Sequence, residues 1–198
     1  MHPTLRTTAL ALALGPLLGA CALVGGSSRS AAPVGAATAA AAPASGLTDA
    51  NIAAIVVAAN NADILYADLA LAKTRDAELR AFATMVKKDH ESVNEAAVAL
   101  VTRLKVTPVD NQISFDLRDD AETKRLRFRD LEGFAFDSTY ISNEVSYHTT
   151  VLGAIDKALI PSAQNAELRA LLVQVRPAVA AHLDHATTLA ATKTVRQR

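Results

Sequence analysis

The 198-residue sequence has no tryptophan, a single cysteine and no net charge, and each of these shortages excludes a class of protein. One cysteine cannot form an intrachain disulfide, so the folded part must be stabilised by its apolar core. Twenty basic residues balance twenty acidic ones, which argues against nucleic acid as a partner, because phosphate binding needs a concentrated basic surface. Aromatic residues make up only 4% of the chain. Alanine, valine and leucine must therefore supply the packing, which favours close helix–helix contacts.

The N-terminal segment has the features of a bacterial export signal. Arg6 precedes an apolar run from Ala9 to Leu18, and small residues follow this run. The run is too short and too interrupted for a comfortable membrane span. Its end, Leu18-Gly19-Ala20-Cys21, resembles the lipobox of bacterial lipoproteins. This resemblance implies cleavage before Cys21 and attachment of lipid to it, whereas the alternative is an ordinary secretory signal with an incidental cysteine.

Changes in composition divide the chain into four parts. Residues after the cysteine are Ala, Gly, Ser and Pro with almost no charge, and such a segment is expected to be a flexible tether. The predicted parts are a signal peptide (1–20), a lipidated cysteine with its linker (21–46), a folded domain (47–192) and a short tail (193–198). We expect an envelope protein on the periplasmic face, bound to the membrane by its acyl chains. The residue after the cysteine is Ala22 and not Asp. By resemblance to the sorting rules of lipoproteins, this favours the outer membrane.

Helical periodicity begins at Thr48 and continues nearly to the end of the chain. Apolar residues recur every three or four positions in four long segments, which predict helices over about 49–73, 76–104, 137–159 and 164–191. Thr48 or Asp49, Asp76 and Asp137 are candidate N-caps, and Pro177 should kink the last helix. A charged segment, 116–131, predicts a shorter helix. The expected fold is all-α: an antiparallel four-helix bundle with an additional short helix between the second and third long helices.

Each predicted apolar stripe is interrupted by a carboxylate or an imidazole. The interrupting residues, in chain order, are Asp63, His90, Glu144, His148 and His182. Burying such groups singly costs several kcal/mol, so they must contact each other, water or a metal. Imidazoles and carboxylates inside a helical bundle are typical of ferritin-like metal sites. These residues are therefore candidate ligands of one divalent transition metal, which could be iron, zinc or copper.

Two neighbouring residues are candidates to support these ligands, and a metal-free network is the alternative to a metal site. Asp89 and His185 flank the same stripes and are candidates to orient the ligands, although Asp89 could instead face solvent. A di-iron site would need Glu-x-x-His on two helices, and none of the candidate histidines has Glu three residues before it. The pattern therefore suits one metal better than two. The alternative is a buried hydrogen-bond network without metal, which would set the register of the helices.

Residues Ala81–His90, with the sequence AFATMVKKDH, resemble the "fA..Mv.DH" signature of the family called domain of unknown function 4142. The family's other marks are also present: Phe136-Asp137 and Tyr140 ahead of His148, and Pro177 ahead of His182-Leu183. The resemblance covers about residues 48–191. It implies a ferritin-like fold and an exported or outer-membrane location, but no established activity. Asp63 departs from the family pattern, which usually has Glu there, and the shorter side chain weakens a role as bridging ligand.

Motifs of other chemistries are absent from the sequence. It has no P-loop, no dinucleotide fingerprint and no Gly-x-Ser-x-Gly elbow, so we assign no catalytic residue. We interpret the protein as an envelope-anchored helical module with a binding or structural role, rather than an enzyme. The alternative is a metal-binding or redox protein that uses the buried imidazoles and carboxylates. The membrane, reached through the lipid anchor, is the only partner that the sequence indicates.

Overall fold

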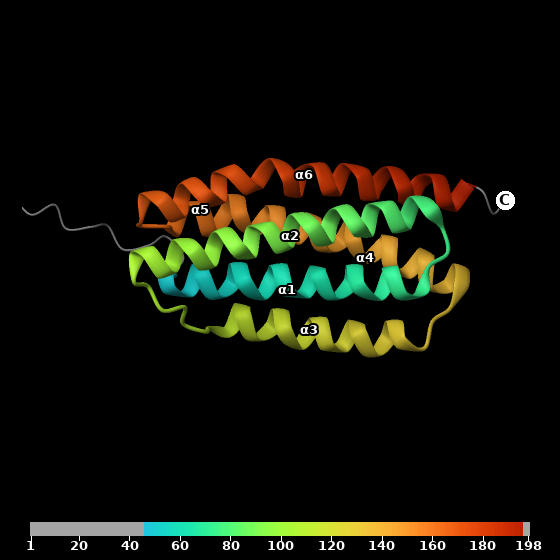
Figure 1. Ribbon diagram of the computed structural model, residues 1–198, viewed down its shortest axis with the longest axis horizontal. Coiled ribbons are helices and arrows are strands. Elements are labelled where there is room, and N and C mark those ends of the chain that lie inside the picture. The colour runs from blue at the N-terminus through green and yellow to red at the C-terminus, as the bar shows by residue number, and fades with distance from the viewer. Residues whose placement is uncertain (1–45, 196–198) are drawn as a thin grey trace, which may run out of the picture. The chain divides into compact units, whose positions relative to one another are not determined.

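The computed structural model describes residues 46–195, and this part of the chain is helical without any strand. Its elements are α1 (Asp49–Lys73), α2 (Ala77–Leu104), α3 (Gln112–Arg129), α4 (Gly133–Ala154), the π-helix η1 (Ile155–Leu159), the short α5 (Ile160–Ser162) and α6 (Ala166–Val195) (Figure 1). The expected signal peptide, the candidate lipidation site Cys21, the linker up to residue 45 and the last three residues of the tail lie outside the described residues. The all-α prediction is confirmed for the described part.

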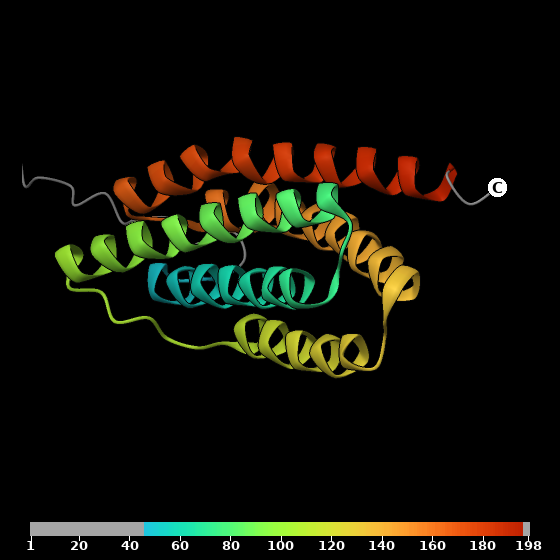
Figure 2. The same ribbon diagram turned by 45° about the vertical axis from the view of Figure 1, so that its right-hand side comes forward.

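The long helices lie side by side, and each one runs opposite to the one before it (Figure 1). Helix α1 contacts α2, α3 and α4, while α6 contacts α2 and α4. Helix α3 packs along α1 on the side away from α2, as the second view also shows (Figure 2). Among the described helices, α1 alone is long and apolar enough to cross a membrane, but 61% of its most apolar window is buried by its neighbours.

The helix starts follow from local hydrogen bonds, and two of the predicted caps are confirmed. The Thr48 side chain accepts a hydrogen bond from the backbone N–H of Asn51 in a capping box. The carboxylate of Asp76 accepts hydrogen bonds from the first backbone N–H groups of α2. The predicted cap at Asp137 is wrong, because α4 already begins at Gly133. Gly133 adopts a left-handed conformation with φ +52°, which glycine adopts without the steric cost of a side chain.

Several further boundaries differ from the sequence-based expectation, and α6 runs over Ala166–Val195 instead of 164–191. Helix α3 begins at Gln112, four residues earlier than predicted, because the Asn111 side chain caps it. The third long segment does not end as a regular α-helix but passes through η1, in which the backbone N–H of Ile160 donates to the carbonyl oxygen of Ile155. Pro177 lies inside α6, and the kink expected there stays a prediction.

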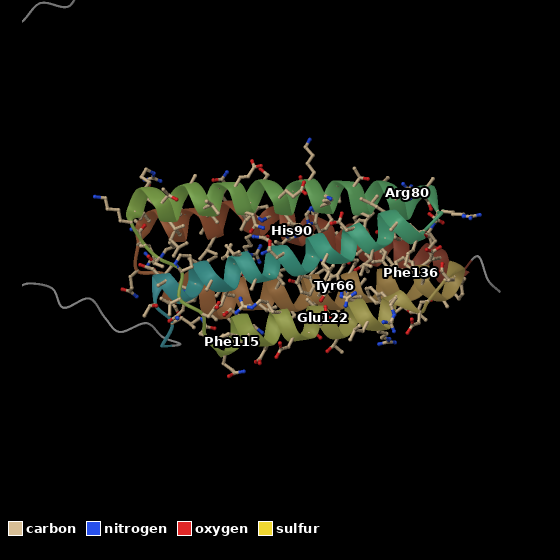
Figure 3. The ribbon with its side chains drawn as sticks, turned by 60° about the horizontal axis from the view of Figure 1, so that its bottom comes forward. Tyr66, Arg80, His90, Phe115, Glu122 and Phe136 are labelled. Carbon is tan, nitrogen blue, oxygen red and sulfur yellow. The ribbon has the colours of Figure 1, made fainter. Side chains whose placement is uncertain are left out.

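The core consists of two apolar clusters that occupy opposite halves of the helices. The first, called here the aromatic cluster, includes Tyr66, Leu79, Phe82, Val86, Phe128, Phe136, Tyr140 and Tyr147. The second, called the aliphatic cluster, includes Ile52, Ile55, Val56, Leu100, Ile155, Leu159, Leu168, Leu172 and Val179. Tyr66 and Phe136 lie to one side of His90 (Figure 3). The residues between the two clusters are therefore the ones that interrupted the apolar stripes.

Candidate metal centre

The candidate ligands lie near the middle of their helices and are buried. Asp63 is in α1, His90 in α2, Glu144 and His148 in α4, and His182 in α6. Because these neighbouring helices alternate in direction, their middles lie at one level between the aromatic and aliphatic clusters. The structure thus brings together all the residues that the sequence analysis named as candidate ligands.

Asp63 lies at the centre of this group. Its Oδ2 atom is 2.9 Å from His90 Nε2 and 3.2 Å from His148 Nε2. Glu144 Oε2 lies 3.6 Å from His148 Nδ1, and the ring centroid of His182 is 5.5 Å from that of His90 and 5.2 Å from that of His148. Two triads, His90–His148–His182 and Asp63–Glu144–His148, each place one ligand atom per residue within 4.8 Å of the others. Such spacing can hold a metal ion.

Each histidine is oriented by an oxygen atom at one ring nitrogen. His90 Nδ1 is 2.6 Å from the side-chain oxygen of Asn60, and His148 Nδ1 is 3.0 Å from the backbone oxygen of Glu144. Both oxygens only accept hydrogen bonds, so Nδ1 carries the proton in each ring. In the neutral form of these imidazoles, Nε2 therefore has the lone pair. Both Nε2 atoms face Asp63.

His182 is oriented from the opposite nitrogen. Its Nε2 lies 3.0 Å from Asp89 Oδ2, which places the lone pair of the neutral ring on Nδ1. A carboxylate or carbonyl that holds the non-ligating nitrogen is the usual partner of a metal-binding histidine. His185, the other predicted orienting residue, is exposed and packs edge-on against Phe82 at 5.2 Å.

Asn60 is a residue of this site that the sequence analysis missed. Its side chain is buried, and it lies three residues before Asp63, so both project from the same face of α1. That spacing is the signal that could have identified it. A polar residue one turn from a buried carboxylate is in position to orient that carboxylate's partner.

The free polar atoms of this cluster are buried without hydrogen bonds. Among the described residues, these atoms include both carboxylate oxygens of Asp63 and of Glu144, Nε2 of His90 and His148, and Nδ1 of His182. Asp63 Oδ2 lies within 3.2 Å of both of these Nε2 atoms, and its contact with His90 helps to lower the pKa of Asp63. Unpaired buried acceptors are costly, and a cation between them would satisfy several at once.

Burial sets the protonation of the cluster. It raises the pKa of Glu144 well above the ordinary value, and the charge of Asp63 adds to this effect. Burial also opposes ionisation of Asp63, but contacts with His90 and His148 outweigh it and lower the pKa of Asp63. Burial lowers the pKa of His148 to about 4 and also lowers the pKa of His182. These two imidazoles are therefore neutral at pH 7, which is the form that binds metals.

The donor set fits a divalent transition metal. Imidazole nitrogens and carboxylate oxygens suit zinc, iron and copper. Ligand atoms that share one ion at about 2.1 Å are themselves about 3–3.5 Å apart. The separations of 2.9 and 3.2 Å between Asp63 Oδ2 and the two Nε2 atoms are of this order. Asp63, whose pKa is lowered, provides one negative charge, and Glu144, whose pKa is raised, provides a second when it is deprotonated on metal binding.

Comparisons with known proteins give one match. A family model described as a domain of unknown function (DUF4142) matches residues 33–189. Comparisons with curated proteins and with solved structures give no match. The matched span includes every candidate ligand and both of the residues, Asn60 and Asp89, that orient a histidine.

Proposed function

The chain belongs to the family described as a domain of unknown function (DUF4142), and we propose that it binds one divalent transition metal between its helices. The observation that carries this proposal is the set of three buried imidazoles, each held by an oxygen at one nitrogen and unpaired at the other. A metal-free hydrogen-bond network would need donors at both nitrogens of these rings. Here the oxygen at one nitrogen of each ring leaves the lone pair of the neutral imidazole on the other nitrogen.

The chain's residues divide into ligands and orienting groups. Nε2 of His90 and of His148, Nδ1 of His182 and the carboxylate of Asp63 would bind the ion directly. Glu144, which lies against His148, would add a carboxylate oxygen or keep its proton. A bound zinc would supply Lewis-acid chemistry, and iron or copper would add redox chemistry.

We also propose that α1, α2, α4 and α6 form a ferritin-like antiparallel four-helix bundle, with α3 packed outside on α1. Each of these four helices supplies at least one candidate ligand, and α3 supplies none. The contacts between α1 and α2, α4 and α6, α2 and α6, and α1 and α4 support a closed ring of four helices.

The domain would work at the cell envelope. We propose that lipid on Cys21 anchors it to the outer membrane on the periplasmic side and that the Ala/Gly/Ser/Pro linker holds it away from the surface. Membrane fractionation of the Cys21→Ser variant tests the anchor. The variant should leave the membrane fraction, and unchanged retention would contradict the lipidation.

Elemental analysis of the full-length protein, purified without an affinity tag, tests the metal site. The wild type should contain close to one zinc, iron or copper ion per chain, either as purified or after incubation with each metal. The His148→Ala variant should lose the metal, because His148 is the ligand that both triads share. The His185→Ala variant is the matched control and should keep it, since that side chain is exposed.

Two results would overturn the proposal. The wild type could remain metal-free after incubation with each ion, or His148→Ala could retain a full equivalent. Asp63→Asn, which keeps the shape of the side chain but removes its charge, covers the case in which His148→Ala fails to fold. An absence of metal in the folded wild type would favour a binding or structural module whose buried network sets helix register.

A further inference from the structure

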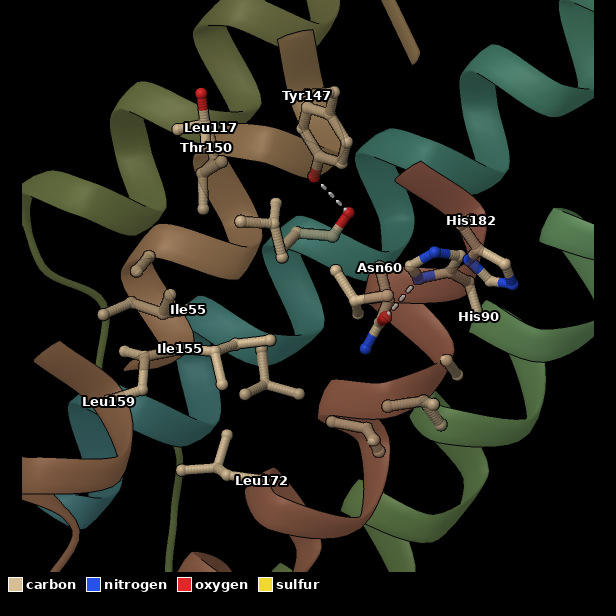
Figure 4. A pocket seen from close by; sticks show the side chains of 18 of the residues that line it. Ile55, Asn60, His90, Leu117, Tyr147, Thr150, Ile155, Leu159, Leu172 and His182 are labelled. Carbon is tan, nitrogen blue, oxygen red and sulfur yellow. Dashed lines mark hydrogen bonds between the residues drawn. The ribbon is translucent and has the colours of Figure 1, made fainter. Parts of the chain in front are cut away.

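The aliphatic cluster contains a cavity of about 140 Å³ beside the candidate metal centre (Figure 4). Most of its wall is aliphatic and comes from α1, η1 and α6, including Ile55, Ile155, Leu159, Leu172 and Val179. His90 and His182 line it at one end. Ile113 and Thr150 also line it, and both are exposed, so the cavity extends from the solvent side of α3 and α4 toward the two imidazoles.

The hydroxyl and amide groups in the wall are already bonded to the protein. The Tyr147 hydroxyl donates to the backbone oxygen of Ala59 at 2.6 Å, and the Thr150 hydroxyl donates to the backbone oxygen of Ser146 at 3.0 Å. The Asn60 oxygen is occupied by His90 (Figure 4). A water molecule in a cavity needs roughly two to four polar partners. Apart from the free ring nitrogens of His90 and His182 at its inner end, this wall offers few. A molecule without polar groups suits the space better.

The backbone departs from the regular α-helix at two places in this wall. The π-helix η1 contributes Ile155 and Leu159, and Pro177 lies between the wall residues Val175 and Val179. Single π-turns occur frequently at functional sites, and an internal proline removes one helical hydrogen bond. Regular helices with aliphatic side chains pack to high density with few voids. Both irregularities are therefore placed where the packing leaves room.

We propose that this cavity binds one small apolar molecule, an uncharged hydrocarbon of up to about the size of benzene. An engineered apolar cavity of about 150 Å³ in another protein stays dry and binds benzene or xenon, so the volume here is sufficient for such a ligand. His90 and His182 at its inner end would place the ligand next to the ion. That adjacency rests on the proposed metal site, whereas the binding of an apolar molecule does not.

Benzene titration of the metal-free full-length protein tests the cavity. Benzene should raise the midpoint of thermal unfolding in a saturable manner, because it binds only the folded state. The Ala154→Leu variant, which places a larger side chain in the cavity, should weaken benzene binding at least tenfold. The Ala158→Leu variant is the matched control and should bind like the wild type, because Ala158 packs against the same cluster but does not line the cavity.

A second filling variant and a second probe keep the test decisive. Val175→Phe serves if Ala154→Leu does not fold, and the ¹²⁹Xe chemical shift reports the cavity in the unmodified protein. A wild type with no saturable response to benzene or xenon would overturn the proposal. So would a folded filling variant that binds benzene as tightly as the wild type.

Cobalt(II) separates this proposal from the metal site. Benzene added to the cobalt-loaded protein should change the visible absorption of the ion, because the ligand would lie beside two of its imidazoles. Cobalt that binds with a spectrum unaffected by bound benzene would overturn the adjacency. A protein that takes up no cobalt but still binds benzene would contradict the proposed function and support the cavity.

Discussion

The two halves of the described helices differ in how they are packed. The aromatic cluster has rings in edge contact, such as Tyr66 and Tyr147 at 5.5 Å and 86°, and it is built on regular helices. The aliphatic cluster contains the cavity, the π-helix η1 and Pro177. The buried imidazoles and carboxylates lie at the boundary between them. The difference indicates that one half stabilises the fold while the other provides space beside the site.

The comparison also explains why the polar cluster can be tolerated. Residues such as Phe82 and Tyr140 are fully buried in the aromatic half, and this large apolar area offsets the cost of burying ionisable groups nearby. The aliphatic half has smaller side chains and an irregular backbone, so it can keep an opening toward the same groups. We expect substitutions in the two halves to have different effects.

The largest expected effect is a difference in stability when leucine is replaced by alanine in one cluster or in the other. Leu79→Ala in the aromatic cluster should lower the free energy of unfolding by about 4–5 kcal/mol, whereas Leu172→Ala should lower it by about 2–3 kcal/mol. Both side chains are buried, but Leu172 lines the cavity and so has fewer contacts to lose. Urea denaturation of the two variants measures the difference. Equal losses would mean that the two halves are packed alike.

A smaller effect is expected at the boundary between the halves. Asp89→Asn should lower metal affinity by about 10- to 100-fold, because it weakens the group that orients His182. The free energy of unfolding of the metal-free protein should change little, since the Asp89 side chain is 44% exposed. Competition titration with a chelator measures the affinity. The exposed Asp184, on α6, supplies the control variant Asp184→Asn, and an equal loss of affinity in both variants would contradict the orienting role.

The smallest expected effect is a pH dependence at the start of α2, at the aromatic end. Partial burial opposes ionisation of Asp76, but hydrogen bonds from Lys193 and from the first backbone N–H groups of α2 outweigh it and lower its pKa. A carboxylate whose pKa is lowered by folding stabilises the fold at pH values above its unfolded-state pKa, 3.8. This stability is lost as pH falls from there through the folded pKa.

Amide hydrogen exchange at low pH measures this loss. Protection at the start of α2 should fall before protection at the start of α1, where the capping box uses the neutral side chains of Thr48 and Asn51. Asp49, in the first turn of α1, accepts hydrogen bonds from the backbone N–H groups of Gln164 and Asn165 and does not cap α1. The Asp76→Asn variant should remove the difference in pH dependence, because Asn still caps the helix but does not ionise. Simultaneous loss at both ends in the wild type would contradict this assignment.

Much of the fold was predictable because its signals are local. Thr48 and Asp76 are caps that act within one helical turn, and the helix periods around them are visible in the sequence. The start of α4 was misplaced, since it depends on the left-handed Gly133 and on burial of Phe136 by other helices. The π-helix η1 left no local signal, because the apolar period continues through it.

The candidate site was predictable in its members but not in its geometry. An ionisable residue on an apolar stripe is visible in the sequence, and each candidate ligand was identified in that way. The orientation of each ring depends on atoms from distant segments, such as Asn60 for His90 across 30 positions. The cavity could not be predicted, because it depends on how six elements fail to fill the space between them.

Local sequence signals were enough to identify the helices, the apolar face of each and the ionisable residues on those faces. Helical periodicity and capping depend on residues three or four positions apart, so they are fixed before any helix meets another. The packing of the helices was needed to show that these residues converge, which nitrogen of each imidazole is held and where space remains beside them. Those features depend on the relative rotation and translation of packed helices, for which one turn's shift would carry a side chain about 5.4 Å from its partner.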